Sequence, residues 1–184
     1  VILLIAANWW LARSTEKAMP PLGKFAEIGG SRVHYVVRGE GPPIVLIHGA
    51  NGALQDFTAT IFDRLAAKYR VIAIDRPGHG YSDRTTEAVT LESQAATLHA
   101  LLNQLDVEQP VVVGFSFGAA VALAYALDYP EETGAVVTLA GAAYEWPGPI
   151  DWKWHMPTWP IIGGFLANNL PQVVGRLIRS AAIR

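Results

Sequence analysis

A serine stands at the centre of the clearest chemical motif in the chain, Gly114-Phe115-Ser116-Phe117-Gly118. An apolar, β-branched run (residues 110–113) precedes the motif and a run of strong helix formers (117–128) follows it, so the serine is expected at a sharp turn between a strand and a helix. Glycine suits the positions two residues away on either side, because a Cβ there would collide with the crowded backbone. This arrangement, a nucleophile elbow, predicts that Ser116 is presented rather than buried.

The first turn of the predicted helix after Ser116 would supply hydrogen-bond donors. Backbone N–H groups at a helix N-terminus have no intrahelical acceptor, and they favour negative charge nearby. When a serine oxygen attacks an acyl carbonyl, the carbonyl oxygen becomes an anion that prepositioned donors stabilise by about 3 kcal/mol each. We therefore expect the N–H of Phe117 to be one donor of an oxyanion hole. The alternative is a turn serine without chemistry.

Bulk properties exclude several functional classes. The chain has 184 residues, 51% of them hydrophobic, which suits one substantial core. A net charge of -2 gives no electrostatic footprint for nucleic acid. Cysteine is absent, which removes disulfides, thiolate nucleophiles and cysteine metal sites. The sequence also has no P-loop, dinucleotide fingerprint or H-E-x-x-H motif, so we expect no metal, no cofactor and no nucleic-acid partner.

Residues 1–13 form an apolar N-terminal segment. An apolar run precedes Trp9 and Trp10, and Arg13 and Lys17 follow them. This pattern is typical of the end of a membrane-spanning helix with aromatic residues at the interface, although about 20 apolar residues are needed to cross a bilayer. A signal-peptide remnant and an apolar arm of a soluble protein are the alternatives. The prediction is membrane association and an anchored or exported protein, with a cytoplasmic location left open.

A polar linker is predicted over residues 14–24, and the globular core over residues 25–143. Short apolar runs predict strands, and apolar residues at helical spacing predict helices. The strands are expected at 25–28, 33–37, 44–47, 71–74, 111–113 and 135–139, and the helices at 54–65, 91–105 and 117–128. Gly29 and Gly30 mark a turn, and Thr90 is placed as an N-cap. The alternation predicts an α/β fold with a mostly parallel, doubly wound sheet and helices on both faces.

Three segments resemble the α/β-hydrolase fold superfamily in type, order and spacing. They are Leu46-Ile47-His48-Gly49 after the third strand, Asp75-Arg76-Pro77-Gly78-His79-Gly80-Tyr81-Ser82 after the fourth, and the Ser116 motif after the fifth. The resemblance covers about residues 25–141. It looks most like the single-domain subfamily with a lid, which includes epoxide hydrolases, haloalkane dehalogenases, haloperoxidase-like esterases and carbon–carbon bond hydrolases.

The resemblance implies roles for the residues around Ser116. It implies that the N–H of Ala50 is the second oxyanion donor, beside that of Phe117. Structural support of the motifs is implied for His48, Gly49, Gly114 and Gly118. Dehalogenases and epoxide hydrolases of this fold carry aspartate at the nucleophile position, because they form an alkyl-enzyme ester. A serine at that position therefore favours acyl chemistry.

The other histidines of the core are assigned structural places. His34 lies in an early strand, His79 in the turn after the fourth strand, and His99 among the apolar positions of a helix. Asp75 ends a strand, and we expect it to organise its loop rather than act as an acid.

Residues 144–184 are predicted to be the start of a helical lid. Four of the six tryptophans of the chain lie there, and they suggest an apolar wall over the site. The candidates for a substrate pocket are Trp146, Trp152, Trp154 and His155. A lid that packs on its own core is the alternative.

A serine triad also needs an acid and a histidine, which in this superfamily follow the nucleophile. About six strands are visible where the family has about eight, with the acid and the histidine after the last two, so both residues are expected beyond residue 184 in a C-terminally incomplete chain. Asp151 and Glu145 are weaker candidates for the acid.

The prediction is a serine hydrolase of a small-molecule ester or similar acyl compound (EC 3.1), inactive as this chain alone. The alternative is a hydrolase-like binding protein without a triad. The identity of the acyl compound and the oligomeric state are not readable from the sequence.

Overall fold

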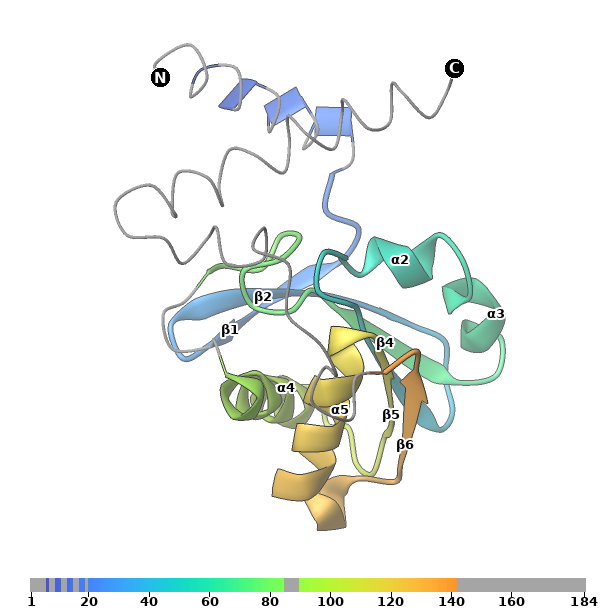
Figure 1. Cartoon of the computed structure of the whole chain (residues 1–184). Helices are drawn as coiled ribbons and strands as arrows, with labels where there is room; N and C mark the ends of the chain where they lie inside the picture. Colours follow the sequence, from blue (N-terminus) through green and yellow to red (C-terminus); the bar gives the residue numbers. More distant parts are fainter. Residues whose placement is uncertain are drawn as a thin grey trace. The chain divides into compact units, whose positions relative to one another are not determined.

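A six-stranded sheet organises the residues that the computed structural model describes, which are 6, 9–10, 13–14, 17–18, 20–84 and 90–141 (Figure 1). The strands are β1 (Lys24–Ile28), β2 (Ser31–Arg38), β3 (Pro43–Ile47), β4 (Arg70–Ile74), β5 (Val111–Phe115) and β6 (Ala135–Leu139). Their spatial order is β1-β2-β4-β3-β5-β6. All six lie where the sequence predicts them, within two residues at each end.

The sheet is mixed, with a parallel core and an antiparallel start. β4, β3, β5 and β6 pair in parallel, whereas β2 is antiparallel to both β1 and β4. Gly29 and Gly30 connect β1 to β2 with φ angles of 57° and 79°, a left-handed conformation that favours glycine. The predicted turn and the predicted, mostly parallel sheet are confirmed.

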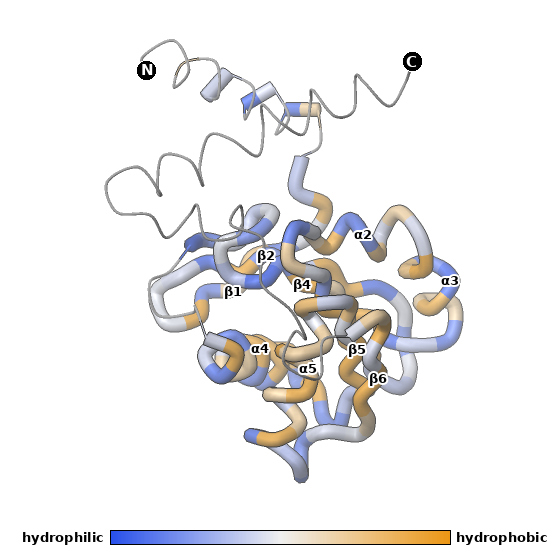
Figure 2. Tube along the Cα trace, viewed as in Figure 1, coloured by the Kyte–Doolittle hydropathy of each residue, from blue (hydrophilic) through white to orange (hydrophobic). Residues whose placement is uncertain are grey.

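Both faces of the sheet are covered, so its central strands have no solvent-facing side. In β3, Val45 and Ile47 belong to one apolar cluster, and Ile44 and Leu46 belong to the other. Successive side chains of a strand point to opposite faces, and a parallel sheet is stable when both faces are buried. Figure 2 shows apolar residues along these central strands and along the helix that follows β5.

Two long helices pack on the first cluster. These are α4 (Leu91–Gln104) and α5 (Phe117–Asp128), which also contact each other. α4 begins at the predicted N-cap, Thr90, whose side chain accepts a hydrogen bond from the N–H of Ser93 while the Ser93 side chain accepts one from the N–H of Thr90. α5 has the predicted bounds, and Pro130 starts a short 3₁₀ turn just after it.

The other face carries two short helices where the sequence predicts one. α2 (Gln55–Thr58) and α3 (Phe62–Ala66) replace the single helical span expected at 54–65, and the chain turns between them. The Thr60 hydroxyl donates to the carbonyl oxygen of Asp56 at 2.6 Å, and the N–H of Thr60 donates to Phe57 in a tighter turn. Threonine competes in this way with the regular helical pattern. The apolar residues of this span are nevertheless packed on the sheet, with Leu54, Phe57 and Phe62 buried.

The residues described between positions 6 and 18 are helical, and the compact unit that holds the sheet begins at Pro21. Trp9 and Trp10 are more than half exposed, and the Arg13 guanidinium lies 4.2 Å from the centre of the Trp9 ring. Within the described ranges, no helix is long and apolar enough to cross a membrane. Ser14 and Lys17, in the predicted linker, are helical. The predicted lid (144–184) lies outside the described residues.

Candidate active site

Ser116 occupies the corner between β5 and α5 in a conformation that few residues adopt. Its φ and ψ angles are 52° and -117°, and it is half-buried. A non-glycine residue with such a φ is strained, and the surrounding structure must hold it in place. The N–H of Ser116 donates to the carbonyl oxygen of Leu139 at 2.9 Å, and its own carbonyl accepts from the N–H of Ala119. The corner is therefore tied to β6 and to the first turn of α5.

The two glycines of the motif allow this corner to form. A Cβ on Gly114 would overlap the carbonyl oxygen of Gly118 and the Cα of Ala119. A Cβ on Gly118 would overlap the carbonyl oxygens of Ile47 and His48, at the end of β3. The close approach that the sequence indicates is therefore real, and the elbow packs against both its own helix and the loop after β3.

That loop after β3 brings Gly49 and Ala50 beside the serine. A Cβ built on Gly49 would lie 3.3 Å from the Cβ of Ser116 and 3.2 Å from the Phe115 ring. In the described part of the chain the N–H of Ala50 has no backbone acceptor. The N–H of Phe117, in the first turn of α5, is one of the N–H groups that a helix leaves without an acceptor. Two N–H groups without an assigned acceptor thus lie in the residues next to the serine in sequence and next to the glycine that approaches it.

His48 is buried beneath this loop and forms no hydrogen bond with the Ser116 hydroxyl. Its Nε2 accepts from the N–H of Arg76 at 3.0 Å, so its Nδ1 carries the proton and donates to the carbonyl oxygen of Gly49 at 2.8 Å. Burial first, and the Arg76 charge second, lower the pKa of His48 to about 4. The ring is therefore neutral at pH 7 and joins the loops after β3 and β4.

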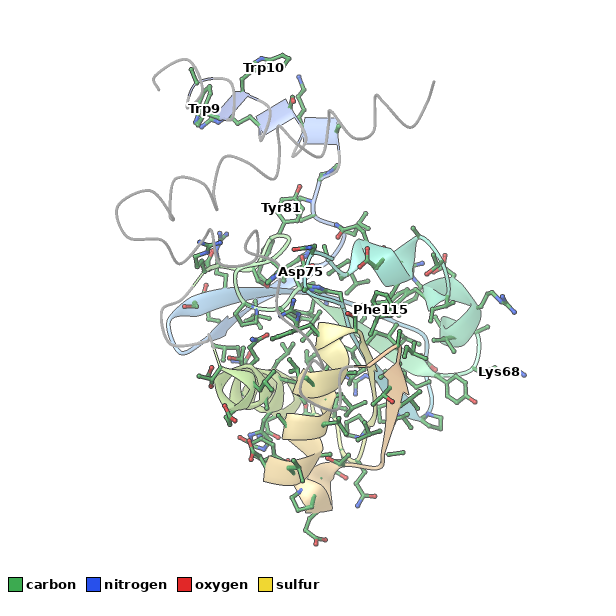
Figure 3. All side chains as sticks on the ribbon, viewed as in Figure 1. Trp9, Trp10, Lys68, Asp75, Tyr81 and Phe115 are labelled. Atoms are coloured by element: carbon green, nitrogen blue, oxygen red, sulfur yellow. The ribbon has the colours of Figure 1, made fainter. Side chains whose placement is uncertain are left out.

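Asp75 organises the loop after β4, as the sequence predicts. Its carboxylate accepts from the N–H groups of Leu54 and Tyr81 at 2.8 and 2.9 Å, and from His34 Nδ1 at 2.7 Å. Burial alone would raise the pKa of Asp75, but these hydrogen bonds, led by that of His34, outweigh it and leave the pKa below its usual value. Figure 3 shows Asp75 at this end of the sheet, near the loop that carries Tyr81.

The remaining histidines of the core serve the fold. His79 Nε2 lies 2.7 Å from the carbonyl oxygen of Ala50 and braces the far side of the same loop. His99 stacks on Tyr129 with ring centres 3.9 Å apart, and its Nε2 lies 3.0 Å from a Glu132 carboxylate oxygen, which links α4 to the chain after α5. Neither histidine is hydrogen-bonded to Ser116.

One residue of the site has no predicted role in the sequence: Arg76. It is 2% exposed, and its guanidinium donates to the carbonyl oxygens of His48 and Gly49. The signal that could have revealed it is its place directly after Asp75, which follows four consecutive apolar residues of β4 (71–74), because an arginine there is drawn into the interior with that strand.

The described residues supply a serine and two donors but no general base. No described acid or histidine is hydrogen-bonded to the Ser116 hydroxyl, and no group of three potential metal ligands occurs among them. A hollow of about 390 Å³ lies elsewhere, between the β1–β2 turn and α4, where Arg32 and Asp83 line it. The predicted pocket residues Trp146, Trp152, Trp154 and His155 lie outside the described residues.

The fold and the serine corner define a class of protein. Residues 42–172 match the family described as alpha/beta hydrolase fold, and the chain belongs to that family.

Individual relatives are hydrolases and an acyltransferase component. The chain is 35% identical over 146 residues to the dihydrolipoyllysine-residue acetyltransferase component of the acetoin cleaving system of Pseudomonas putida, a match over 77% of this chain and 39% of that protein. A meta-cleavage product hydrolase from Pseudomonas fluorescens has a TM-score of 0.63 and 32% identity over 68% of this chain and 47% of its own. An esterase from Exiguobacterium antarcticum has a TM-score of 0.62 and 26% identity over 66% and 46%. The chain spans less than half of the length of each.

Proposed function

We propose that the protein is a serine hydrolase that cleaves a small-molecule ester or similar acyl compound (EC 3.1). The observation that carries the proposal is the strained corner at Ser116, between the start of α5 and the loop after β3, where the N–H of Ala50 has no acceptor among the described residues. A strained residue held by its surroundings is typical of functional sites. Membership of a hydrolase family and the named esterase relative support the same reaction class.

The proposed mechanism follows from charge development. Ser116 Oγ attacks the acyl carbon and gives up its proton to a histidine that lies outside the described residues. The carbonyl oxygen becomes an anion, which the N–H groups of Ala50 and Phe117 stabilise by about 3 kcal/mol each. The alcohol then leaves with the proton, and water hydrolyses the acyl-serine ester to release the acid. These proposed steps call for neither a metal nor a cofactor.

A fluorophosphonate probe tests this function in the full-length protein. The probe reacts with an activated serine, and mass spectrometry should locate the adduct on Ser116. Ser116→Ala should abolish both the adduct and ester hydrolysis, whereas the Ser93→Ala variant, altered at a half-buried serine in the first turn of α4, should keep both. Equal labelling of wild type and Ser116→Ala would contradict the nucleophile. If the wild type takes up no probe, the alternative holds: a hydrolase-like binding protein without an assembled triad.

For the N-terminal segment we propose association with a membrane surface. The exposed Trp9 and Trp10 and the cation of Arg13 support this, because tryptophan and arginine both favour the interface between lipid and water. Flotation with phosphatidylglycerol-containing liposomes tests the proposal. Trp9→Ala together with Trp10→Ala should move the protein from the floated to the soluble fraction, and an unchanged distribution would contradict it.

A further inference from the structure

A buried cation lies directly beneath the loop that borders Ser116. The Arg76 guanidinium donates from Nε to His48 O at 3.1 Å, from Nη2 to Gly49 O at 2.8 Å and from Nη1 to Gln94 Oε1 at 2.9 Å. Among the described residues no carboxylate forms an ion pair with it. Burial lowers the pKa of Arg76 to about 10, which leaves it charged at neutral pH. An unpaired buried charge is costly, so a role that offsets this cost is expected.

The same guanidinium contacts both halves of the proposed oxyanion hole. Its two carbonyl acceptors belong to the loop that carries Ala50, and its Cζ lies 4.8 Å from the centre of the Phe117 ring. A cation over an aromatic face is attracted to it. One side chain therefore links the loop after β3 to the first residue of α5.

Peptide geometry turns the contact with Gly49 into an orientation of Ala50. The described chain has no cis peptide bond, so the Gly49 C=O and the Ala50 N–H lie in one plane and point in opposite directions. Arg76 Nη2 and His48 Nδ1 both hold the Gly49 oxygen from the buried side, and Gly52 N donates to it at 3.3 Å. The Ala50 N–H must then point away from these donors and from the core.

We propose that Arg76 is a positioning residue that aims and polarises the N–H of Ala50 toward the oxyanion. The inference rests on the proposed hydrolase function. Of the three donors to the Gly49 oxygen, only Arg76 carries a charge, and a charge-assisted hydrogen bond to the C=O end of a peptide strengthens the donor at its N–H end. Arg76 thus acts on the reaction through the backbone and does not touch the substrate.

Arg70 provides a matched control for this proposal. It stands at the opposite end of β4 and also donates to two carbonyl oxygens, those of Leu105 and Asp106, at 2.6 and 3.2 Å. These carbonyls belong to the end of α4, away from the elbow. Arg70→Lys therefore measures the effect of losing an arginine that only links two backbone segments.

The first test separates turnover from binding in the full-length protein. Arg76→Lys keeps the charge but loses the planar fork, so kcat for a short-chain ester should fall about 10- to 100-fold with little change in KM. Arg70→Lys should leave both constants close to wild type. Gln94→Met removes the acceptor of Nη1 and keeps Arg76 itself. It should also lower kcat, but by a smaller factor than Arg76→Lys. If Arg76→Lys lowers only the melting temperature, with kcat per folded molecule unchanged, the positioning role is wrong.

The second test needs no activity. In NMR spectra of labelled protein, Arg76→Lys should shift the Gly49 carbonyl carbon and the Ala50 amide, whereas Arg70→Lys should leave both in place. Wild-type resonances in Arg76→Lys would overturn the inference even if the enzyme is active. If the wild type neither turns over ester nor takes up probe, the proposed function fails, while the spectra still decide whether Arg76 orients this peptide.

Discussion

The backbone of Gly114 lies against the carbonyl group of Gly118, so closely that a Cβ on Gly114 would overlap that carbonyl oxygen. The end of β5 and the first turn of α5 are therefore in contact across Ser116. This contact explains why the serine can hold a φ of 52°: neither side of the corner can open without separating β5 from α5.

Gly118→Ala should destabilise the fold and displace the loop after β3. The new Cβ would overlap the carbonyl oxygens of Ile47 and His48, which belong to the backbone and cannot rotate away. We expect a loss of about 2–3 kcal/mol in the free energy of unfolding, measured by urea denaturation. Leu127→Ala, at a position that is 80% exposed on the same helix, should change it little. Equal stability of the two variants would contradict the crowded corner.

Stability should fall in mild acid because of His48. The pKa of His48 is lowered from 6.5 to about 4 in the folded protein, so between these values the unfolded chain binds a proton that the folded chain does not. The free energy of unfolding should therefore decrease by about 3 kcal/mol as the pH falls from 6.5 to 4. Urea titrations at several pH values measure this slope. In His48→Gln, which cannot titrate, the slope should be shallower, and an identical slope would rule out His48 as its source.

Two aspartates with similar numbers of hydrogen bonds should differ sharply in their contribution to stability. Asp75 is fully buried and accepts from His34, Leu54 and Tyr81, so Asp75→Asn leaves buried donors unpaired and should cost about 3 kcal/mol. Asp83 accepts from Arg32 at the surface, and Asp83→Asn should cost much less. Thermal unfolding of both variants at pH 7 is the measurement. Similar melting temperatures would show that the buried loop does not depend on Asp75.

The stacked rings of His99 and Tyr129 should be energetically coupled. The rings are nearly parallel, with 5° between their planes, and they join α4 to the chain after α5. A double-mutant cycle with His99→Ala and Tyr129→Ala should give a coupling energy of about 0.5–1.5 kcal/mol. The pair His99 and Asn103, neighbours on α4 alone, serves as the comparison. Strict additivity of the His99 and Tyr129 substitutions would mean that the stack does not stabilise the fold.

Several features of the fold could be predicted because they depend on residues close together in the chain. The β-branched run before Gly114 and the helix formers after Phe117 are local signals, and their bounds in the structure agree with the prediction. The division of the span at 54–65 could not be predicted in the same way. It depends on the hydrogen bond from the Thr60 hydroxyl to the backbone of Asp56, and the spacing of apolar residues does not predict that bond.

The sequence by itself determined the sheet, the helices and the serine corner, since local propensity and the spacing of apolar residues and glycines set these. Only the tertiary structure decided what surrounds the serine. Arg76 and Gly49 are 27 residues apart in the chain, and they meet because β3 and β4 are parallel neighbours whose carboxyl ends lie at the same edge of the sheet. A buried arginine beneath the loop that carries Ala50 is a consequence of strand order, which no local pattern around either residue contains.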